Sequence, residues 1–442
     1  MQEVLHEGAS HIGAGAVTAA LLIFLGAYGI IISEKIHRTI IAIFAGALMV
    51  VVGVFMNFYD QEGAIHAIDF NTVGLLVGMM IIVGVSKDTG LFQYVAVKAA
   101  KFAKGDPWKI LILFSIITAV FSALLDNVTT VLLMVPMTLV ICDNLRINPI
   151  PFLMLEILMS NIGGTATLIG DPPNILIGSA AGLSFMDFVV NLAPVIVVIF
   201  IVLIPLIKLL YKNKIVAKKE DMESIMKLNE IESIQDLVLL KKSLFVLLVV
   251  ILGFFLHGAL HMEAATIAIF GAGLLLLLDR KNPEKALHEV EWITIFFFIG
   301  LFVLIGGLEH VGVIGWAAEK LVEVTGGSMK LTALVILWGG AIFSAFVDNI
   351  PFVATMIPLV HEMGVEAGGI FPDLEPIWWS LALGACLGGN GTLVGASANL
   401  VVAGMAEKSG YKISFVDYMK VGLGIMFITV AISHVYILIR FL

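Results

Sequence analysis

Apolar residues follow one another in runs of roughly 20 from one end of the chain to the other. The runs lack the strict alternation of a membrane β-barrel strand, and lipid offers the backbone no water, so they predict spanning helices. Two further apolar stretches, 107–143 and 330–363, each predict a hairpin around a central Asp-Asn pair. The spans are expected at roughly 17–33, 39–57, 71–87, 151–180, 188–210, 243–260, 264–279, 292–308, 377–405 and 415–439.

The composition agrees with a polytopic membrane protein. Of the 442 residues, 60% are hydrophobic and only 13% are charged, whereas a soluble domain carries about 25% charged residues. The two cysteines, Cys142 and Cys386, form no pairing or ligand pattern, so neither a disulfide framework nor a zinc site is expected. Nothing in the sequence calls for a cofactor, a resident metal or nucleic acid.

Basic residues orient the chain, because cytoplasmic loops carry an excess of Lys and Arg. No basic residue precedes Lys35, so the N-terminus is expected outside and the loop with Lys35 and Arg38 inside. The lysine-rich segments 98–109 and 208–242 are also expected inside. Each half then holds five spans and one hairpin, and since five is odd, the second half enters the membrane inverted.

The two halves match in sequence as well. A shift of 222 residues places Asp126-Asn127 on Asp348-Asn349, and a shift of 225 places "GGTATLIGDPPNI" on "GGNGTLVGASANL". The predicted organisation is a first repeat over 1–207, a cytoplasmic linker over 208–242 and a second, inverted repeat over 243–442. Inverted repeats with interrupted helices are the architecture of secondary transporters, whose sites lie at the repeat interface.

The segments 151–180 and 377–405 cannot be continuous helices. Pro172 and Pro173 remove two backbone donors, and the glycines of both segments permit unusual backbone conformations. Unwound backbone at this depth persists only where it is buried in protein or lines a cavity, so its carbonyl groups are candidate ligands. Whether the hairpins are re-entrant or fully spanning remains open, since each arm is nearly long enough to cross the membrane.

Three acids, Asp126, Asp171 and Asp348, fall in these otherwise apolar segments. An unpaired carboxylate is costly there, so such acids face cavities, pair with cations or take up protons. No Lys or Arg lies in the four motif segments, and three acids without a base suit cations or protons and repel dicarboxylates and phosphate. The alternative for each Asp is a helix cap at the turn.

The same segments supply neutral oxygen and nitrogen ligands, some of which are expected only to cap helix ends. The candidate substrate or ion ligands are Asp126, Asn127, Thr129, Thr130, Asn161, Thr165, Thr167, Asp171, Asn174, Asp348, Asn349, Asn390, Thr392, Ser397 and Asn399.

Four motifs carry a family resemblance: "LLDNVTTVLLMVP", "NIGGTATLIGDPPNI", "FVDNIPFVATMIP" and "GGNGTLVGASANLV". The chain resembles the ion transporter superfamily, and within it the arsenite permeases, NhaD-type sodium/proton antiporters and the melanosomal P protein. The resemblance covers nearly the whole chain. It implies two re-entrant hairpins, a scaffold part and a mobile part, elevator-like alternating access and, commonly, homodimers.

The resulting hypothesis is a proton-coupled secondary transporter of the bacterial inner membrane, not an enzyme. The resemblance favours export of arsenite and antimonite in exchange for protons carried by Asp126, Asp348 and Asp171, with an ATPase subunit as a further conceivable partner. Sodium or lithium/proton antiport is the alternative. A buried thiol at Cys386 bears on arsenite, although a small apolar role suits it better. A channel or a scaffold protein fits the acids less well, and no nucleotide-binding loop is present.

Overall fold

The computed structural model describes residues 13–33, 35–211, 215–280 and 283–442. Within these ranges the chain is helical, and the only β-pairing is a single bridge between Gly364 and Phe371. Ten of the described helices are long and apolar enough to cross a membrane. The predicted all-α polytopic membrane fold is confirmed.

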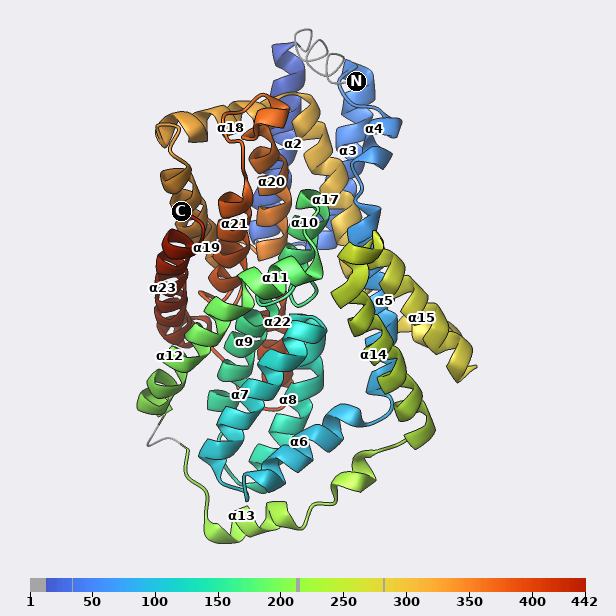
Figure 1. The fold of residues 1–442 in the computed structure, drawn as a ribbon, viewed down its shortest axis with the longest axis vertical. Helices are drawn as coiled ribbons and strands as arrows, with labels where there is room; N and C mark the ends of the chain where they lie inside the picture. Colours follow the sequence, from blue (N-terminus) through green and yellow to red (C-terminus); the bar gives the residue numbers. More distant parts are fainter. Residues whose placement is uncertain (1–12, 34, 212–214, 281–282) are drawn as a thin grey trace.

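The order of the helices repeats along the chain (Figure 1). The first series is α2 (Ala14–Ser33), α3 (Arg38–Met56), α5 (Phe70–Lys87), α6 (Leu91–Phe102), α7 (Pro107–Leu124), α8 (Asn127–Asn144), α9 (Ile150–Gly164), α10 (Pro172–Ala181) and α12 (Ala193–Tyr211). The second is α14 (Leu237–Leu260), α15 (Ala264–Asp279), α17 (Trp292–His310), α18 (Val313–Val324), α19 (Met329–Phe346), α20 (Asn349–Glu362), α21 (Glu375–Gly388), α22 (Ser397–Lys408) and α23 (Phe415–Arg440).

Shorter helices join these elements. They are α4 (Gln61–His66), α11 (Phe185–Asn191), α13 (Lys219–Met226), α16 (Pro283–His288) and the 3-10 turns η1 (Glu230–Ser233) and η2 (Val365–Ala367).

Packing follows the same repeat. The contact of α3 with α17 has its counterpart in the contact of α15 with α5. Likewise, the contact of α7 with α9 corresponds to that of α19 with α21. Helix α8 packs on α22, and α20 packs on α10 in the same way. Each hairpin therefore contacts the broken helix of the other half, so the halves interlock around the two breaks.

The two hairpins approach each other from opposite ends of the molecule. Helices α6 and α18 lie at these ends in Figure 1, and each starts at a glycine with a positive φ, Gly90 at 79° and Gly312 at 76°. The hairpins α7–α8 and α19–α20 follow them and meet in the middle. Helix α20 has 14 residues, or about 21 Å, less than the roughly 30 Å hydrocarbon core. The short α20 and the meeting of the two tips fit re-entrant hairpins, whereas α7, α8 and α19, with 18 residues each, are by length also able to span.

Part of the predicted linker is docked on the end of the molecule that carries α6. The Lys101 ammonium donates to the Leu228 carbonyl at 3.0 Å and pairs with Glu230, and it holds the pKa of that carboxyl below its usual range. The Gln235 amide donates to the Thr89 carbonyl at 3.0 Å. A side chain at Gly90 would collide with the Ser233 carbonyl, which fixes glycine at this contact.

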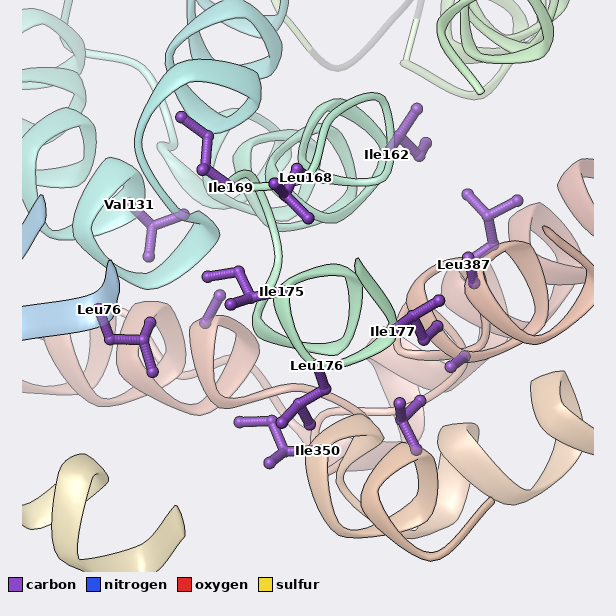
Figure 2. Packing of buried hydrophobic residues seen from close by; sticks show 14 of the residues in the cluster. Leu76, Val131, Ile162, Leu168, Ile169, Ile175, Leu176, Ile177, Ile350 and Leu387 are labelled. Carbon is purple, nitrogen blue, oxygen red and sulfur yellow. The ribbon is translucent and has the colours of Figure 1, made fainter. Parts of the chain in front are cut away.

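Apolar side chains seal the centre of the molecule around α10. Figure 2 shows Ile175, Leu176 and Ile177 of α10 surrounded by side chains of neighbouring helices, among them Leu76 of α5 and Ile350 of α20. All five are nearly inaccessible to solvent. Polar groups at the breaks therefore lie in an apolar surrounding, where each must find a partner inside the protein.

The contact between α9 and α7 requires glycine at position 163. An added Cβ would lie 2.2 Å from the Ala119 carbonyl oxygen, whereas a Cβ at Gly339 in α19 would have nothing within 4 Å. We expect Gly163→Ala to destabilise the fold by about 1–3 kcal/mol. Gly339→Ala should be neutral or slightly stabilising. Thermal unfolding of the purified protein in detergent tests this, and equal melting temperatures for the two variants would contradict the packing described.

Candidate functional site

Two asparagines hold the interrupted segments in shape. The Asn174 amide donates to the carbonyls of Thr165 at 3.1 Å and Thr167 at 2.9 Å. Its repeat partner Asn399 donates to the carbonyls of Gly389 at 2.7 Å and Thr392 at 2.9 Å. Both side chains are fully buried. They satisfy the backbone where no helical partner exists, which is a structural role and not that of a free ligand.

Hydroxyl groups tie each hairpin to the break beside it. Thr167 Oγ1 donates to the Ala123 carbonyl, and Thr392 Oγ1 to the Ala345 carbonyl, both at 2.5 Å. Thr165 Oγ1 is also occupied, since it donates to the Asn161 carbonyl at 2.7 Å. These three threonines were predicted as ligands, and the structure gives each hydroxyl a backbone partner.

The acids at the hairpin tips cap the helices that follow them. Asp126 accepts from the Thr129 amide at 2.7 Å at the start of α8, and Asp348 from the Ile350 amide at 3.1 Å at the start of α20. The helix-cap alternative thus accounts for one oxygen of each carboxylate. The second oxygen of each remains to be placed, and here the two tips differ.

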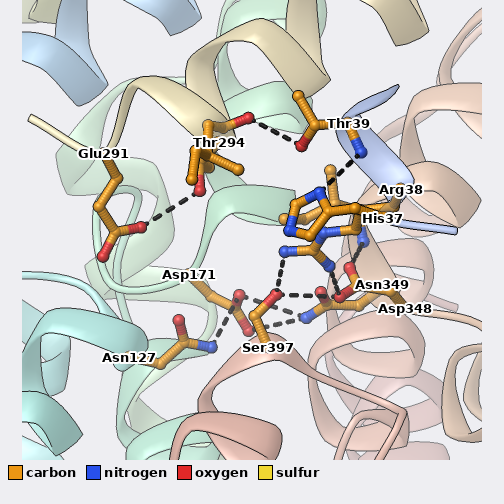
Figure 3. A network of polar contacts seen from close by, with 12 residues as sticks. His37, Arg38, Thr39, Asn127, Asp171, Glu291, Thr294, Asp348, Asn349 and Ser397 are labelled. Carbon is orange, nitrogen blue, oxygen red and sulfur yellow. Dashed lines mark hydrogen bonds and ion pairs between the residues drawn. The ribbon is translucent and has the colours of Figure 1, made fainter. Parts of the chain in front are cut away.

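Asp171 joins the two hairpin tips. This fully buried acid makes no capping bond to α10. Its carboxylate instead accepts from the Asn127 amide of the first tip at 3.2 Å and from the Asn349 amide of the second at 3.3 Å (Figure 3). The thiol of Cys386 contacts the same carboxylate. A carboxylate whose partners are all neutral can gain or lose a proton without breaking an ion pair.

A chain of amides continues from Asp171 into both breaks. Asn127 Nδ2 donates to Asn161 Oδ1 at 3.1 Å. Asn161 Nδ2 in turn donates to Asn390 Oδ1 and Asn399 Oδ1, both at 3.0 Å. The structure therefore brings residues from both repeats, 34 to 238 positions apart, into one connected network.

The first tip keeps acceptors without partners. Asn127 Oδ1 and Thr130 Oγ1 are buried and have no hydrogen-bond partner. Asn127 and Thr130 lie three residues apart in the first turn of α8, at a spacing that places their side chains on one face, and Asp126 is the N-cap of the same helix. Only oxygen atoms make up this set, and it can accept a cation or a solute hydroxyl group.

The second tip is occupied by a cation of the protein. Arg38, at the start of α3, forms an ion pair with Asp348 and donates to Ser397 Oγ at 2.8 Å. Its guanidinium also lies 4.9 Å from the centre of the Phe297 ring. The expectation of acids without a base is therefore wrong. Sequence reasoning counted Arg38 only as a loop charge, because the pair joins residues 310 positions apart.

Two further acids were missed. Glu291 precedes α17 and accepts from Thr294 Oγ1 at 3.2 Å, and Figure 3 shows it beside the network. Glu156 in α9 is almost fully buried, bonds Thr138 through one oxygen and has no partner for the other. A glutamate inside the apolar run "FLMLEILMS" is a signal that the sequence does contain.

The network contains one soft ligand, a cysteine thiol, among the described residues. Cys386 is buried in α21, and its thiol donates to Asn174 Oδ1 at 3.4 Å. Within the described ranges, no three His, Cys, Asp or Glu side chains are placed to hold a metal ion. The chemistry available is that of carboxylates, carboxamides and hydroxyls.

Comparison with known proteins relates the chain to transporters. The model of a family described as CitMHS, citrate transporter, matches residues 28–384. An uncharacterized transporter of Mycobacterium tuberculosis is 43% identical over 425 residues, which are 96% of this chain and 98% of that protein. The human P protein is 35% identical over 501 residues, covering 96% of this chain and 60% of the P protein.

A solved structure shares the fold. The YdaH transporter of Alcanivorax borkumensis, described as having an unusual topology, superposes with a TM-score of 0.58. The superposition covers 92% of this chain and 99% of that one at 13% sequence identity. At this identity the likeness concerns the fold alone.

The bracing role of Asn399 can be tested. Asn399→Ala leaves the Gly389 and Thr392 carbonyls buried without a donor, at a cost of about 1–3 kcal/mol for each unsatisfied group. We therefore expect a clear fall in melting temperature. Asn144→Ala is the matched control, because that amide lies exposed at the end of α8 and bonds only the Val140 carbonyl. An unchanged melting temperature in Asn399→Ala would remove the structural assignment.

Proposed function

The chain belongs to the CitMHS citrate transporter family of the ion transporter superfamily, and from that premise we propose a secondary transporter that exchanges protons for a small cation. The observation that carries the proposal is Asp171, a fully buried acid that links both hairpin tips through amides alone. Ionisable residues of this kind inside membrane proteins serve proton relays and ion pathways. Asp171 is the proposed proton carrier.

The charge balance supports a cationic cargo. Four acids, Asp126, Asp171, Asp348 and Glu291, surround the network, and Arg38 is the base that contacts it. An excess of carboxylates attracts cations and repels anions. Protons and alkali cations are the cargo that this balance favours.

Sodium or lithium is the cargo that the ligand set favours. The open acceptors at the first tip are Asn127 Oδ1 and Thr130 Oγ1, and the carboxylate of Asp126 caps the same helix, so the ligand set consists of oxygen atoms. Hard cations prefer carboxylate, carbonyl and hydroxyl oxygen. We place the cargo site at this tip, beside the proton carrier, so that binding of the cation and of the proton influence each other through Asn127.

Arsenite and antimonite form the second candidate. The thiol of Cys386 lies within hydrogen-bond reach of Asn174, close to the break, and sulfur is the ligand type that soft ions prefer. Neutral arsenous acid has hydroxyl groups that Asn127 Oδ1 and Asp126 can accept. The thiol faces the Asn174 brace and not the open acceptors, which is why this cargo ranks second.

The family description names citrate. A polycarboxylate alone meets an excess of carboxylates, and the Arg38 guanidinium is already paired with Asp348. Citrate accompanied by a divalent cation meets less repulsion. Citrate therefore enters the experiment as a third cargo, alone and with Mg²⁺.

The proposed setting is the bacterial inner membrane with the N-terminus outside. The basic residues of α6 and of the docked linker lie at one end of the molecule, which the positive-inside rule assigns to the cytoplasm (Figure 1). Elevator-like movement, a homodimer and an ATPase partner remain predictions from the family resemblance. Membership of a transporter family supports a role in transport and not in catalysis of a chemical reaction.

Proton exchange in everted membrane vesicles tests the proposal. With an acid interior reported by a pH-sensitive dye, we expect sodium or lithium to dissipate the gradient. Asp171→Asn should abolish exchange, because an amide cannot carry a proton. Asp126→Asn should raise the half-saturating sodium concentration at least about tenfold, since 1.4 kcal/mol of lost binding corresponds to a factor of ten.

Asp417→Asn is the control variant, because Asp417 is an exposed acid at the start of α23 that pairs with Lys420. It should exchange like the wild type. A response to arsenite or antimonite alone would replace the cation proposal with the second candidate. A response to citrate alone would reject both inorganic cargoes, and full activity of Asp171→Asn would reject the proton carrier.

A further inference from the structure

Arg38 forms an ion pair between two groups of helices. The frame helices, defined as α2, α3, α5, α14, α15 and α17, pack mainly on one another. The site helices, defined as α7–α10 and α19–α22, carry the hairpins and the breaks. Arg38 starts a frame helix, while its partners Asp348 and Ser397 start the site helices α20 and α22 (Figure 3).

A second contact reinforces this junction. The Tyr28 hydroxyl of α2 donates to the Pro351 carbonyl at 2.9 Å and lies 2.6 Å from Thr355 Oγ1, both in α20. These hydrogen bonds are neutral and can be exchanged for water at low cost. The Arg38–Asp348 pair is different, because separation leaves two charges without partners.

The position of Arg38 is unfavourable unless the pair forms. The start of a helix carries partial positive charge, so a cation in the first turn of α3 is destabilising. The side chain of Asp348 is only 9% exposed, and a buried carboxylate that loses its partner is strongly destabilised. Asp348 can therefore release Arg38 only when another positive charge replaces it.

We propose that Arg38 is a displaceable counter-cation: it holds the second hairpin tip against the frame and leaves Asp348 when a proton or the transported cation binds there. This inference rests on the proposed cation exchange and adds a rule of coupling to it. The site helices are tied to the frame while Asp348 is without cargo and released when Asp348 is neutralised. Movement of the site helices thus depends on occupancy.

The surroundings of the pair favour such an exchange. Asp348 faces Ser397 of α22 and lies within electrostatic reach of Asp171 in α10. Arg38 faces Glu291 of α17, follows His37 and stacks on Phe297. Glu291 in turn interacts with Asp126 of α8. Once displaced, the guanidinium keeps the aromatic face of Phe297 and stays within electrostatic reach of Glu291, so its release is not a transfer into a purely apolar region.

The first repeat has no counterpart of the Arg38–Asp348 ion pair at its hairpin tip among the described residues. Asp126 has open acceptors beside it and forms no ion pair with the described residues, whereas Asp348 is paired with Arg38. The frame contact on that side is neutral, from the Asn71 amide of α5 to Ser179 Oγ of α10 at 3.2 Å. The two tips therefore have different roles: the first receives cargo directly, and the second receives it only in competition with Arg38.

Sodium affinity provides the decisive test. In the vesicle assay, Arg38→Gln should lower the half-saturating sodium concentration about tenfold, which corresponds to roughly 1.4 kcal/mol of removed competition. In an Asp348→Asn background, the same substitution should leave it unchanged. A purely structural Arg38 would instead reduce the amount or rate of the transporter without tightening sodium binding. An unchanged or raised half-saturating concentration in Arg38→Gln would overturn the proposal.

We call the Arg38–Asp348 contact the latch. Hydrogen exchange tests this latch without assuming which cargo binds. Relative to their intrinsic exchange rate, which itself falls toward acid pH, amides at the start of α3 and α20 should be less protected in wild-type protein at acid pH or in saturating sodium. In Arg38→Gln their protection should be low under all conditions. Wild-type vesicles could show no response to sodium while pH still changes amide protection in the wild type but not in Arg38→Gln. In that case the cargo assignment fails and the latch is supported. Exchange that is equal in both proteins at every pH would reject the latch.

Two further variants guard against misfolding. Ser397→Ala removes one hydrogen bond of the guanidinium and one of the Asp348 carboxylate without changing the charge, and we expect it to lower the half-saturating sodium concentration about threefold, a smaller effect of the same sign. Arg146→Gln is the matched control, because Arg146 pairs with Asp221 at a site where its side chain is 80% exposed. It should match the wild type in both assays. A raised half-saturating concentration in Ser397→Ala would count against the proposal.

Discussion

Two helices of this transporter are interrupted where the backbone has no water to bind, and one asparagine side chain holds each interruption together. Asn174 and Asn399 donate to the unwound carbonyls, and threonine hydroxyls tie the same segments to the hairpins. Without these bonds the breaks would be costly gaps in an apolar surrounding. With them, the breaks become rigid platforms from which polar groups can face a shared centre.

The breaks have a second consequence for electrostatics. Helices α8, α10, α20 and α22 all begin at the network, so four partial positive charges converge there. They offset part of the mutual repulsion among Asp126, Asp171 and Asp348. A cluster of acids that would otherwise repel one another can thus exist in the interior. It remains responsive to protons and cations, because helix ends stabilise the acids without neutralising them.

Duplication produced two similar halves, and function depends on where they differ. Asp171 has no acidic counterpart, since Ala396 occupies the matching position. Arg38 pairs with the second tip only, and Glu156 matches Leu381 of the other repeat. These differences place the proposed proton carrier, the open acceptors and the internal cation at separate points of a pseudo-symmetric frame. A symmetric site could not couple two events in a fixed order.

Length, hydropathy and proline or glycine content are local properties of the chain, so the sequence predicted the spanning helices, the breaks and the hairpins. It also marked Asp126, Asp171 and Asp348 as the central acids. It did not predict the short helices α6 and α18. It could not separate ligands from braces, since the partners of Thr167 and Asn174 depend on how the unwound segments fold back. The Arg38–Asp348 pair was beyond it altogether, because only the packing of α3 against the second hairpin brings these distant residues together.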